Sequence, residues 1–254
     1  MKLAADDVRG VAETLFIPLA YRDDPQSRRF RDQIDYDWQK FDGGLQRAGI
    51  VARTRILDEL VGAFVHEHRG GLVVNMGAGL DTRFHRLDDG AVQWLDVDLP
   101  EVIALREQLD EPASPRHALV AGSILDDAWL DEVRRRSPQA IMFVAEGLLP
   151  YFDEADHRRI FAALAEGFPG EEIVFHTSSP TLMAKLAPPS LAKLRMTAEM
   201  RWGLEDGRDV ERLDPRVRYV AEYSLVDLIT APAPPGLSAD DLRRAVKIVH
   251  ARFV

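Results

Sequence analysis

The sequence predicts an α/β fold built on a mainly parallel sheet. Short apolar runs, each long enough for a buried strand, alternate with stretches in which apolar residues recur at helical spacing. Strands that alternate with helices are typical of a parallel sheet with right-handed crossovers. A Gly-x-Gly turn, Gly77-Ala78-Gly79, directly follows the first of these runs. The length of 254 residues allows one large α/β domain or two small ones.

The segment ahead of the first strand is expected to be helical. Four residues at helical spacing predict one amphipathic helix that ends at Gly43-Gly44: Phe30, Ile34, Trp38 and Phe41. A second helix is predicted between Arg53 and Glu67, where the apolar residues share one face. Gly70-Gly71 then ends this helical part of the chain.

Seven strands are expected after residue 70. The first five cover residues 72–76, 92–97, 118–121, 140–145 and 172–176, with helices over 101–109, 128–135 and 154–168 between them. Beyond Pro180 the pattern becomes helical again. Two late strands follow over 216–224 and 245–254, separated by a Pro-rich link and a short helix for which Ser238 is a good N-cap. The last strand suits an exposed edge or an interior place equally well.

The composition excludes several kinds of site and partner. Without cysteine the chain has no disulfide, thiolate zinc site, iron–sulfur cluster or Cys nucleophile. A net charge of −10 argues against general nucleic-acid binding, since phosphate contacts need clustered Lys and Arg. No apolar stretch reaches the roughly 18 residues of a membrane span, and the first residues lack the apolar core of a signal peptide. We therefore expect a cytoplasmic protein with no membrane partner, and no His/Asp/Glu spacing suggests a metal site.

The glycine turn and the acidic residue after the next strand indicate an adenosine cofactor. Glycine allows a tight turn and a close approach of ligand to backbone. Asp98 follows Gly77 by 21 residues, at the end of the second strand, where a carboxylate can accept hydrogen bonds from ribose hydroxyls. Strand, turn, helix and acidic residue in this register favour a binding site over an ordinary strand-to-helix turn.

The turn favours S-adenosylmethionine over NAD. A dinucleotide site has a third small residue where this chain has Thr82, and the carboxylate of Asp81 would repel a pyrophosphate. S-adenosylmethionine has no phosphate and carries a positive sulfonium and an ammonium group. The sequence also has neither a Gly-x-x-x-x-Gly-Lys-Ser/Thr phosphate loop nor a Gly-x-Ser-x-Gly nucleophile elbow.

From Val11 onward the chain resembles the leucine carboxyl methyltransferase superfamily, and most closely its bacterial branch of tetracenomycin-type polyketide O-methyltransferases. The motifs that carry this resemblance are residues 13–19 (ETLFIPL), 52–55 (ARTR), 77–83 (GAGLDTR), 96–100 (DVDLP), 145–152 (AEGLLPYF) and 247–250 (KIVH). The resemblance implies a class I S-adenosylmethionine-dependent methyltransferase fold, Rossmann-like, with a seven-stranded sheet and a reversed last strand. It also implies one domain: an N-terminal helical cap (1–70), cofactor-binding strands (71–178), a helical insertion after the fifth strand (179–212) and closing strands (213–254).

The resemblance also implies roles for residues of the cofactor site. Arg53 should bind the methionyl carboxylate, which suits a guanidinium because it pairs with a carboxylate through two parallel hydrogen bonds. The alternative for Arg53 is a solvated arginine at a helix start. Gly77 and Gly79 should pass under the methionyl part and Asp98 should hold the ribose. Asp96, two residues before Asp98, should point to the opposite face or pack structurally.

Further positions are implied at the ends of later strands. Ser123 and Ile124 match the pair that flanks the adenine, although the family often has Asp where this chain has Ser123, so an ordinary loop role stays open. Glu146 ends the fourth strand and should approach the amino group of the cofactor. Tyr151 and His176 are the candidate bases near the methyl-transfer zone. Packing is the alternative for Tyr151, and satisfaction of backbone groups is the alternative for His176.

We therefore expect an S-adenosylmethionine-dependent O-methyltransferase that acts on a carboxylate or hydroxyl of a small apolar or aromatic, polyketide-like molecule. A carboxylate needs no base, whereas a phenol or alcohol would benefit from one. The N-terminal helices and the insertion should form the acceptor pocket from Phe16, Tyr21, Tyr36, Trp38, Met183, Met196, Met200 and Trp202. The alternatives are methylation of a protein C-terminus, an NAD-dependent oxidoreductase and a cofactor-binding protein without catalysis. The oligomeric state stays open.

Overall fold

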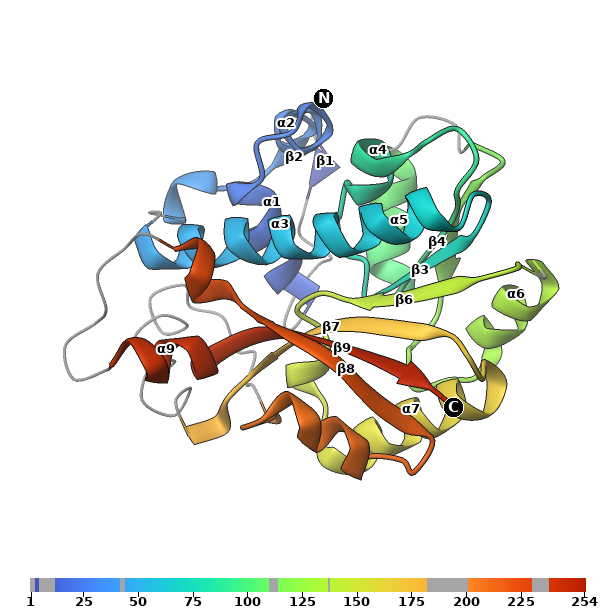
Figure 1. The fold of residues 1–254 in the computed structure, drawn as a ribbon. Coiled ribbons are helices and arrows are strands. Elements are labelled where there is room, and N and C mark those ends of the chain that lie inside the picture. The colour runs from blue at the N-terminus through green and yellow to red at the C-terminus, as the bar shows by residue number, and fades with distance from the viewer. Residues whose placement is uncertain are drawn as a thin grey trace.

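The computed structural model describes residues 3–4, 12–41, 44–109, 114–136, 138–181, 201–229 and 238–254. In this part of the chain the main sheet has seven strands in the order β5-β4-β3-β6-β7-β9-β8 (Figure 1). They are β3 (Leu72–Met76), β4 (Gln93–Asp98), β5 (His117–Ala121), β6 (Ile141–Ala145), β7 (Glu172–Ser178), β8 (Val217–Ser224) and β9 (Val246–Phe253). Each matches a predicted strand to within a few residues.

The first five strands are parallel, and the last strand is reversed, as expected. β3 pairs in parallel with β4 and β6, β4 with β5, and β6 with β7. β9 lies between β7 and β8 and is antiparallel to both. The C-terminal strand is therefore interior, and β8 forms the edge. β4 lies on one side of β3, and β6 lies on its other side. The strand order therefore reverses at β3, and such a reversal opens a crevice at the carboxyl ends of the strands.

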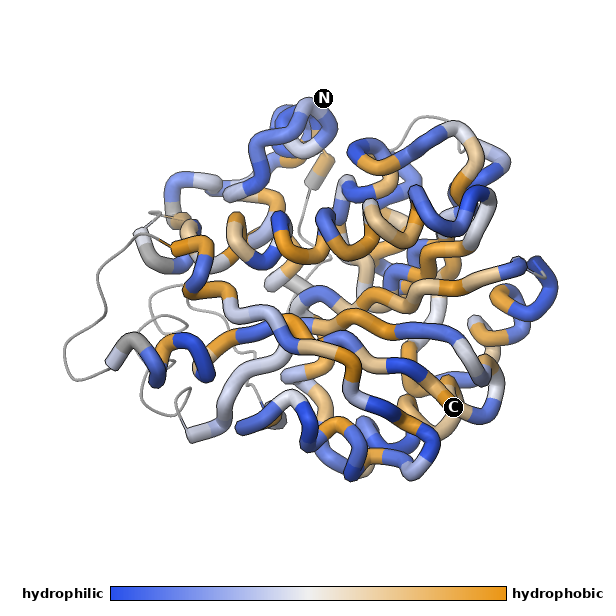
Figure 2. Tube along the Cα trace, viewed as in Figure 1, coloured by the Kyte–Doolittle hydropathy of each residue, from blue (hydrophilic) through white to orange (hydrophobic). Residues whose placement is uncertain are grey.

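Alternate residues of the buried strands supply the cores on the two faces of the sheet. Leu72, Val74 and Met76 face one apolar cluster, whereas Val73 faces the other, as the two-residue period of a strand requires. Figure 2 shows hydrophobic residues along the central strands and hydrophilic residues on α9 (Ala239–Ala245) and the outer turns. Burial on both faces explains why β3 is apolar at every position except Asn75.

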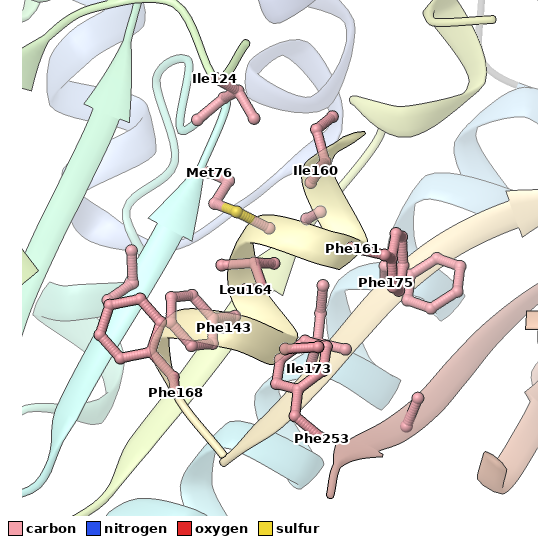
Figure 3. Close-up of a cluster of buried hydrophobic side chains, with 14 of the residues drawn as sticks. Met76, Ile124, Phe143, Ile160, Phe161, Leu164, Phe168, Ile173, Phe175 and Phe253 are labelled. Carbon is pink, nitrogen blue, oxygen red and sulfur yellow. The ribbon is translucent and has the colours of Figure 1, made fainter. Parts of the chain in front are cut away.

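One face of the sheet is covered by α6 (Ala128–Arg136), α7 (Glu154–Gly167) and the 3-10 helix η4 (Gly207–Arg212). Figure 3 shows Ile160, Phe161 and Leu164 of α7 packed toward aromatic residues of the strands. Ile124, after β5, and Met76, at the end of β3, lie at one side of the same cluster. The core thus reaches the carboxyl ends of the strands and supports the loops there.

The other face is covered by α3 (Gly44–Glu67), α4 (Arg83–Leu87) and the 3-10 helix η5 (Leu225–Leu228). The helix α3 begins nine residues earlier than the predicted Arg53, and it crosses the sheet in Figure 1. α5 (Pro100–Leu109) follows β4 and packs with the N-terminal helices through Leu105 and Leu109.

The N-terminal segment differs from its prediction. It contains η1 (Ala12–Leu15), α1 (Phe16–Tyr21), α2 (Pro25–Gln33) and η2 (Trp38–Lys40), with β1 (Leu3–Ala4) paired to β2 (Ile34–Asp35). The single helix predicted through residues 30–41 is wrong, because α2 ends at Gln33 and Ile34 continues in extended backbone. The helix starts earlier instead, where the side chain of Asp24 caps it and Pro25 occupies its first position.

The late part of the chain is only partly described. Ser238 caps α9 through a capping box with Asp241, which confirms the predicted helix start. Most of the predicted helical insertion, including Met183, Met196 and Met200, lies outside the described residues, as does the Pro-rich link. None of the described helices is long and apolar enough to cross a membrane. Among the described residues no group of three or more His, Asp or Glu is placed to hold a metal ion.

Candidate active site

A cavity of about 400 Å³ lies at the carboxyl ends of the parallel strands. Its walls come from the loops after β3, β4, β5 and β6, from the end of β7, and from α3 and the N-terminal segment. All nine residues named in the sequence as site candidates line it: Arg53, Gly77, Gly79, Asp98, Ser123, Ile124, Glu146, Tyr151 and His176. The topology thus brings together residues that are more than 120 positions apart in the chain.

The glycine turn after β3 forms one wall because only glycine suits its geometry. Gly77 and Gly79 have φ angles of 62° and 51°, in the left-handed region that side chains rarely adopt. A Cβ at position 77 would lie 2.6 Å from Cδ1 of Leu148, and one at position 79 would lie 3.1 Å from Cβ of Leu15. From α5, Arg106 donates to the carbonyls of Gly79 and Asp81 at 2.9 and 2.6 Å and holds the turn in place.

Asp98, at the end of β4, presents its carboxylate to the cavity beside this turn. Its two oxygens accept the backbone N–H groups of Gly79 and Leu99, both at 2.7 Å. Burial raises the pKa of Asp98, against the lowering effect of these hydrogen bonds. Each carboxylate oxygen still has capacity for a further donor. This geometry suits a pair of ribose hydroxyls.

Asp96 is fully buried and is not among the residues that line the cavity. Its carboxylate contacts four side chains: Asn75 Nδ2 (2.9 Å), Trp94 Nε1 (3.0 Å), Arg106 Nη2 (2.8 Å) and His117 Nε2 (2.6 Å). Burial would raise the pKa of Asp96, but Arg106 and His117 outweigh burial and lower it. The packing alternative given for Asp96 is therefore the one that fits.

Glu146, just after β6, is bound by three arginines. Its Oε1 accepts Nη2 of Arg22 at 2.8 Å and Nε of Arg53 at 2.9 Å, and its Oε2 accepts Nη2 of Arg83 at 2.6 Å. Burial alone would raise the pKa of Glu146, but these three guanidinium charges hold it well below its usual range. The carboxylate is therefore ionised, and Oε2 keeps the larger remaining capacity for a donor from the cavity.

Arg53 has hydrogen-bond donors that no described residue uses. Its side chain is 9% exposed and bonds Glu146 through Nε alone. In the described part of the chain no partner is recorded for its Nη1 and Nη2. Gly147 makes room for this guanidinium, because a Cβ there would lie 3.2 Å from Nη1. Two parallel N–H donors at the edge of a cavity can hold a carboxylate in the bidentate arrangement.

Asp81 is neutralised inside the protein. Its carboxylate contacts Nη1 of Arg22 at 3.1 Å and Nη1 of Arg83 at 2.5 Å, and Nη2 of Arg86 lies 3.6 Å away. Burial alone would raise the pKa of Asp81, but the positive charges of Arg22 and Arg83 outweigh burial and lower this pKa. The expectation that Asp81 would repel a pyrophosphate was incomplete, since it took no account of the arginines that balance this charge.

The two candidate bases differ in their surroundings. Burial, together with the positive charge of Arg53, lowers the pKa of His176 to about 3, against the effect of Glu146. Its Nδ1 is buried and has no hydrogen-bond partner among the described residues. His176 is therefore neutral at neutral pH and a weak base. Tyr151, in η3 (Leu149–Tyr151), is half-buried at the cavity wall.

The residues named for the adenine lie on the loop after β5. The hydroxyl of Ser123 accepts the backbone N–H of Leu125 at 3.2 Å, so it already supports the loop. That hydroxyl can still donate to, or accept from, a second partner. Ile124 is buried and joins the core of Figure 3. Both the loop role and the binding role of Ser123 are compatible with this arrangement.

The aromatic residues predicted for the acceptor wall lie outside the cavity lining, whereas Met183, Met196 and Met200 are outside the described residues. Phe16, Tyr36 and Trp38 pack on one another, with Phe16 and Tyr36 ring centroids 4.3 Å apart, and Tyr21 packs on Phe41. Trp202 stacks on His157 at 3.6 Å. None of these aromatic residues lines the cavity. The N-terminal side of the cavity is formed instead by Thr14, Leu15, Ile17, Pro18, Arg22, Gln46 and Ile50.

The sequence held a signal for part of this wall. Gln46, Ile50 and Arg53 follow the spacing of one helix face, so the start of α3 and Arg53 face the same cavity. The amide oxygen of Gln46 accepts the hydroxyl of Tyr21 at 2.9 Å. Arg22 had no comparable signal, because its partners Asp81 and Glu146 are distant in the sequence.

Comparisons with known proteins identify a methyltransferase family. A family model described as leucine carboxyl methyltransferase matches residues 13–165. The tetracenomycin polyketide synthesis O-methyltransferase TcmP of Streptomyces glaucescens is 31% identical over 231 residues, which are 86% of this chain and 84% of that protein. The S-adenosyl-L-methionine-dependent methyltransferase dpfgK of Gibberella zeae is 30% identical over 182 residues, 67% of this chain and 61% of that protein.

Solved structures share the fold at low sequence identity. A putative methyltransferase from Thermobifida fusca YX has a TM-score of 0.68 and 13% identity, over 98% of this chain and 96% of that one. The N-methyltransferase NodS from Bradyrhizobium japonicum WM9, in complex with S-adenosyl-l-homocysteine, has a TM-score of 0.53 and 16% identity, over 96% and 98% of the two chains. The expected class I methyltransferase fold is thereby confirmed.

Proposed function

Because this chain belongs to the leucine carboxyl methyltransferase family, we propose that it transfers the methyl group of S-adenosylmethionine to an oxygen atom of a small apolar or aromatic molecule. Its similarity to known methyltransferases identifies it as an S-adenosylmethionine-dependent methyltransferase. The observation that carries the proposal is one cavity that holds the glycine turn, the Asp98 carboxylate and the unused donors of Arg53. We take the chain to act as one methyltransferase domain, in which the N-terminal segment closes one side of this cavity.

The polar groups of the cavity match those of S-adenosylmethionine in kind and order. Arg53 would bind the methionyl carboxylate through Nη1 and Nη2, and Oε2 of Glu146 would accept from the ammonium group. Gly77 and Gly79 would let the ligand pass close to the backbone, and Asp98 would hold the ribose hydroxyls. Ser123 and Ile124 would border the adenine, with Ile124 supplying an apolar surface. NAD has no ammonium group, so it would leave Oε2 of Glu146 without a cationic partner from the ligand.

The reaction depends mainly on alignment of the acceptor oxygen with the methyl group and the sulfur of the cofactor. The sulfonium of S-adenosylmethionine supplies an activated methyl group, and an oxygen nucleophile attacks in line with the bond that breaks. Holding the reactants in this geometry can supply several kcal/mol, on the order of 7 or more in favourable cases. The protein contributes by fixing the ends of the cofactor and by closing the site from water with the N-terminal segment.

The groups that line the cavity favour an acceptor that is already ionised. His176, with its pKa lowered to about 3 by burial and by Arg53, gives little driving force for taking a proton from a phenol or alcohol. A carboxylate needs no proton removal. His176 and Tyr151 would then serve to orient the acceptor oxygen by hydrogen bonds. Similarity to the tetracenomycin polyketide synthesis O-methyltransferase of Streptomyces supports a polyketide-like acceptor.

Calorimetry and a product assay test the proposal. Wild-type protein should bind S-adenosylhomocysteine and should not bind NAD; absence of heat with S-adenosylhomocysteine up to about 1 mM would contradict it. Release of S-adenosylhomocysteine should then be measured with aromatic carboxylic acids and with the matching benzylic alcohols. We expect turnover of the acids and much less of the alcohols. Turnover of peptide carboxylates alone would point to a protein C-terminus as acceptor.

A further inference from the structure

Arg22 connects the N-terminal segment to the charged end of the cavity. It follows α1 directly, is 7% exposed and lines the cavity. All three of its guanidinium nitrogens have protein partners. Nη2 bonds Glu146 at 2.8 Å, Nη1 lies 3.1 Å from Oδ1 of Asp81, and Nε donates to the Thr54 hydroxyl at 3.3 Å. Each of its three nitrogens is therefore tied to another residue of the site, through three of the five N–H donors of a guanidinium.

The contact with Glu146 determines how Arg53 is used. Arg22 and Arg53 share Oε1 of Glu146, and Arg83 takes Oε2. An oxygen of a carboxylate accepts about two hydrogen bonds, so Oε1 is filled. Arg53 reaches Glu146 through Nε only, and Arg22 occupies the second position on Oε1 that a terminal nitrogen of Arg53 could otherwise take. Without Arg22, Oε1 would be open, and Arg53 would be free to turn its terminal nitrogens toward Glu146 instead of toward the cavity.

Arg22 also balances charge in a buried network. In the described residues this network joins four arginines to four carboxylates: Arg22, Arg53, Arg83 and Arg86 with Asp24, Asp58, Asp81 and Glu146. Loss of Arg22 would leave an excess negative charge. That charge would stand beside Arg53, where it would oppose the binding of an anionic group.

We propose that Arg22 is a positioning residue for the carboxylate of the methionyl group, acting through Glu146 and Asp81 to keep Arg53 turned toward the cavity. This inference rests on the proposed function. It separates Arg22 from a residue that merely anchors the N-terminal segment. Arg31 has that anchoring geometry: its Nη1 donates to the backbone carbonyls of Leu19 and Arg22, at 2.6 and 2.5 Å, and it has no recorded contact with Glu146 or Asp81 in the described structure.

The test compares two ligands that differ only in the part in question. S-adenosylhomocysteine carries the amino-acid group, and 5′-methylthioadenosine keeps the nucleoside without it. Calorimetry with Arg22→Met should show affinity for S-adenosylhomocysteine reduced by about tenfold or more, with 5′-methylthioadenosine within about twofold of wild type. Arg22→Lys should recover part of the loss, because lysine keeps the charge but cannot bond both carboxylates as a planar fork.

Arg31→Met is the matched control, and its ratio of the two affinities should equal that of wild type. Equal losses for both ligands in Arg22→Met, or no loss, would overturn the inference, as would the same change of ratio in Arg31→Met. If Arg22→Met does not fold, the ratio measured for Arg22→Lys decides in the same way. Failure of wild type to bind S-adenosylhomocysteine would overturn the proposed function itself and is thus a distinguishable result.

Discussion

Two buried carboxylates of this protein are held by arginine, yet their surroundings serve different ends. Asp96 lies within β4 and contacts Arg106, His117 and two further side chains. Glu146 follows β6 and contacts Arg22, Arg53 and Arg83. Both carboxylates have pKa values lowered by these cations against the effect of burial. Only Glu146 lines the cavity.

The difference lies in the donors that remain after the ion pairs are made. Arg106 spends its other donors on the backbone carbonyls of Gly79 and Asp81. Arg53 bonds Glu146 through one nitrogen and lines the cavity, and its other two nitrogens have no recorded partner among the described residues. We interpret Asp96 as structural, because the donors of its partner Arg106 bond protein groups. We interpret Glu146 as part of a binding site, because its partner Arg53 keeps donors for a ligand. Experiments on stability and on binding can distinguish the Asp96 cluster (Asp96, Arg106 and His117) from the Glu146 cluster (Glu146, Arg22, Arg53 and Arg83).

The largest effect is expected from Asp96→Ala. This change leaves Arg106 and His117 buried without their anion, and loss of one partner of a buried pair costs about 3–5 kcal/mol of stability. Urea unfolding should report that loss, while Asp131→Ala, a change at an exposed residue of α6, should stay within about 0.5 kcal/mol of wild type. If Asp96→Ala lowered the free energy of unfolding by less than about 1 kcal/mol, the structural role assigned to Asp96 would be contradicted.

The next effect is expected from Arg53→Met, and it should appear in binding. The open donors of Arg53 are lost while Arg22 and Arg83 still balance Glu146, so affinity for S-adenosylhomocysteine should fall by about thirtyfold or more, which is about 2 kcal/mol. Calorimetry measures the affinity and urea unfolding checks that the fold persists. Arg55→Met, at an exposed position on the same helix, should bind as wild type does. Unchanged affinity in Arg53→Met would contradict a binding role for the residues around Glu146.

A smaller effect concerns pH and His176, which lies beside the Glu146 cluster. Burial and Arg53 lower the pKa of His176 to about 3 from its ordinary 6.5, so on acidification the unfolded chain takes up this proton before the folded one. This contribution to stability is complete above about pH 6.5 and is lost as the pH falls toward 3. Relative to His176→Gln, wild type should therefore lose up to about 2 kcal/mol between about pH 6.5 and pH 5.

Urea unfolding at several pH values measures this difference. His66→Gln, at an exposed position of α3, serves as the control and should keep the pH dependence of wild type. If His176→Gln and wild type lost stability in parallel, His176 would not be the neutral buried group that its surroundings indicate.

Local signals in the sequence were sufficient for the sheet and for the side of the cavity that is formed by the glycine turn and Asp98. The strands are buried apolar runs bounded by turns, so their period and length are visible without tertiary information. The turn at Gly77 and Gly79 needs positive φ angles, and the distance to Asp98 reflects one helix and one strand. These features depend on residues close in the chain. For Arg53, Glu146 and the loop after β5 the resemblance to a family supplied the positions.

The N-terminal side was less predictable because its structure depends on distant contacts. The helical spacing of Phe30, Ile34 and Trp38 suggested one helix, yet Ile34 pairs with Leu3 in a short sheet. The aromatic residues of this region pack on one another, which their types alone could not distinguish from a ligand-binding wall. Arg22 meets Glu146 across 124 positions, and no local pattern records such a contact.

A crystal structure of the protein with S-adenosylhomocysteine tests the central claim most directly. The account predicts the amino-acid carboxylate within hydrogen-bond distance of Nη1 and Nη2 of Arg53, with the ribose hydroxyls on Asp98. Arg22 and Glu146 should keep the contacts described above. A ligand bound with its carboxylate elsewhere, and with Arg53 paired to protein groups alone, would contradict the claim that the Glu146 cluster prepares this binding site.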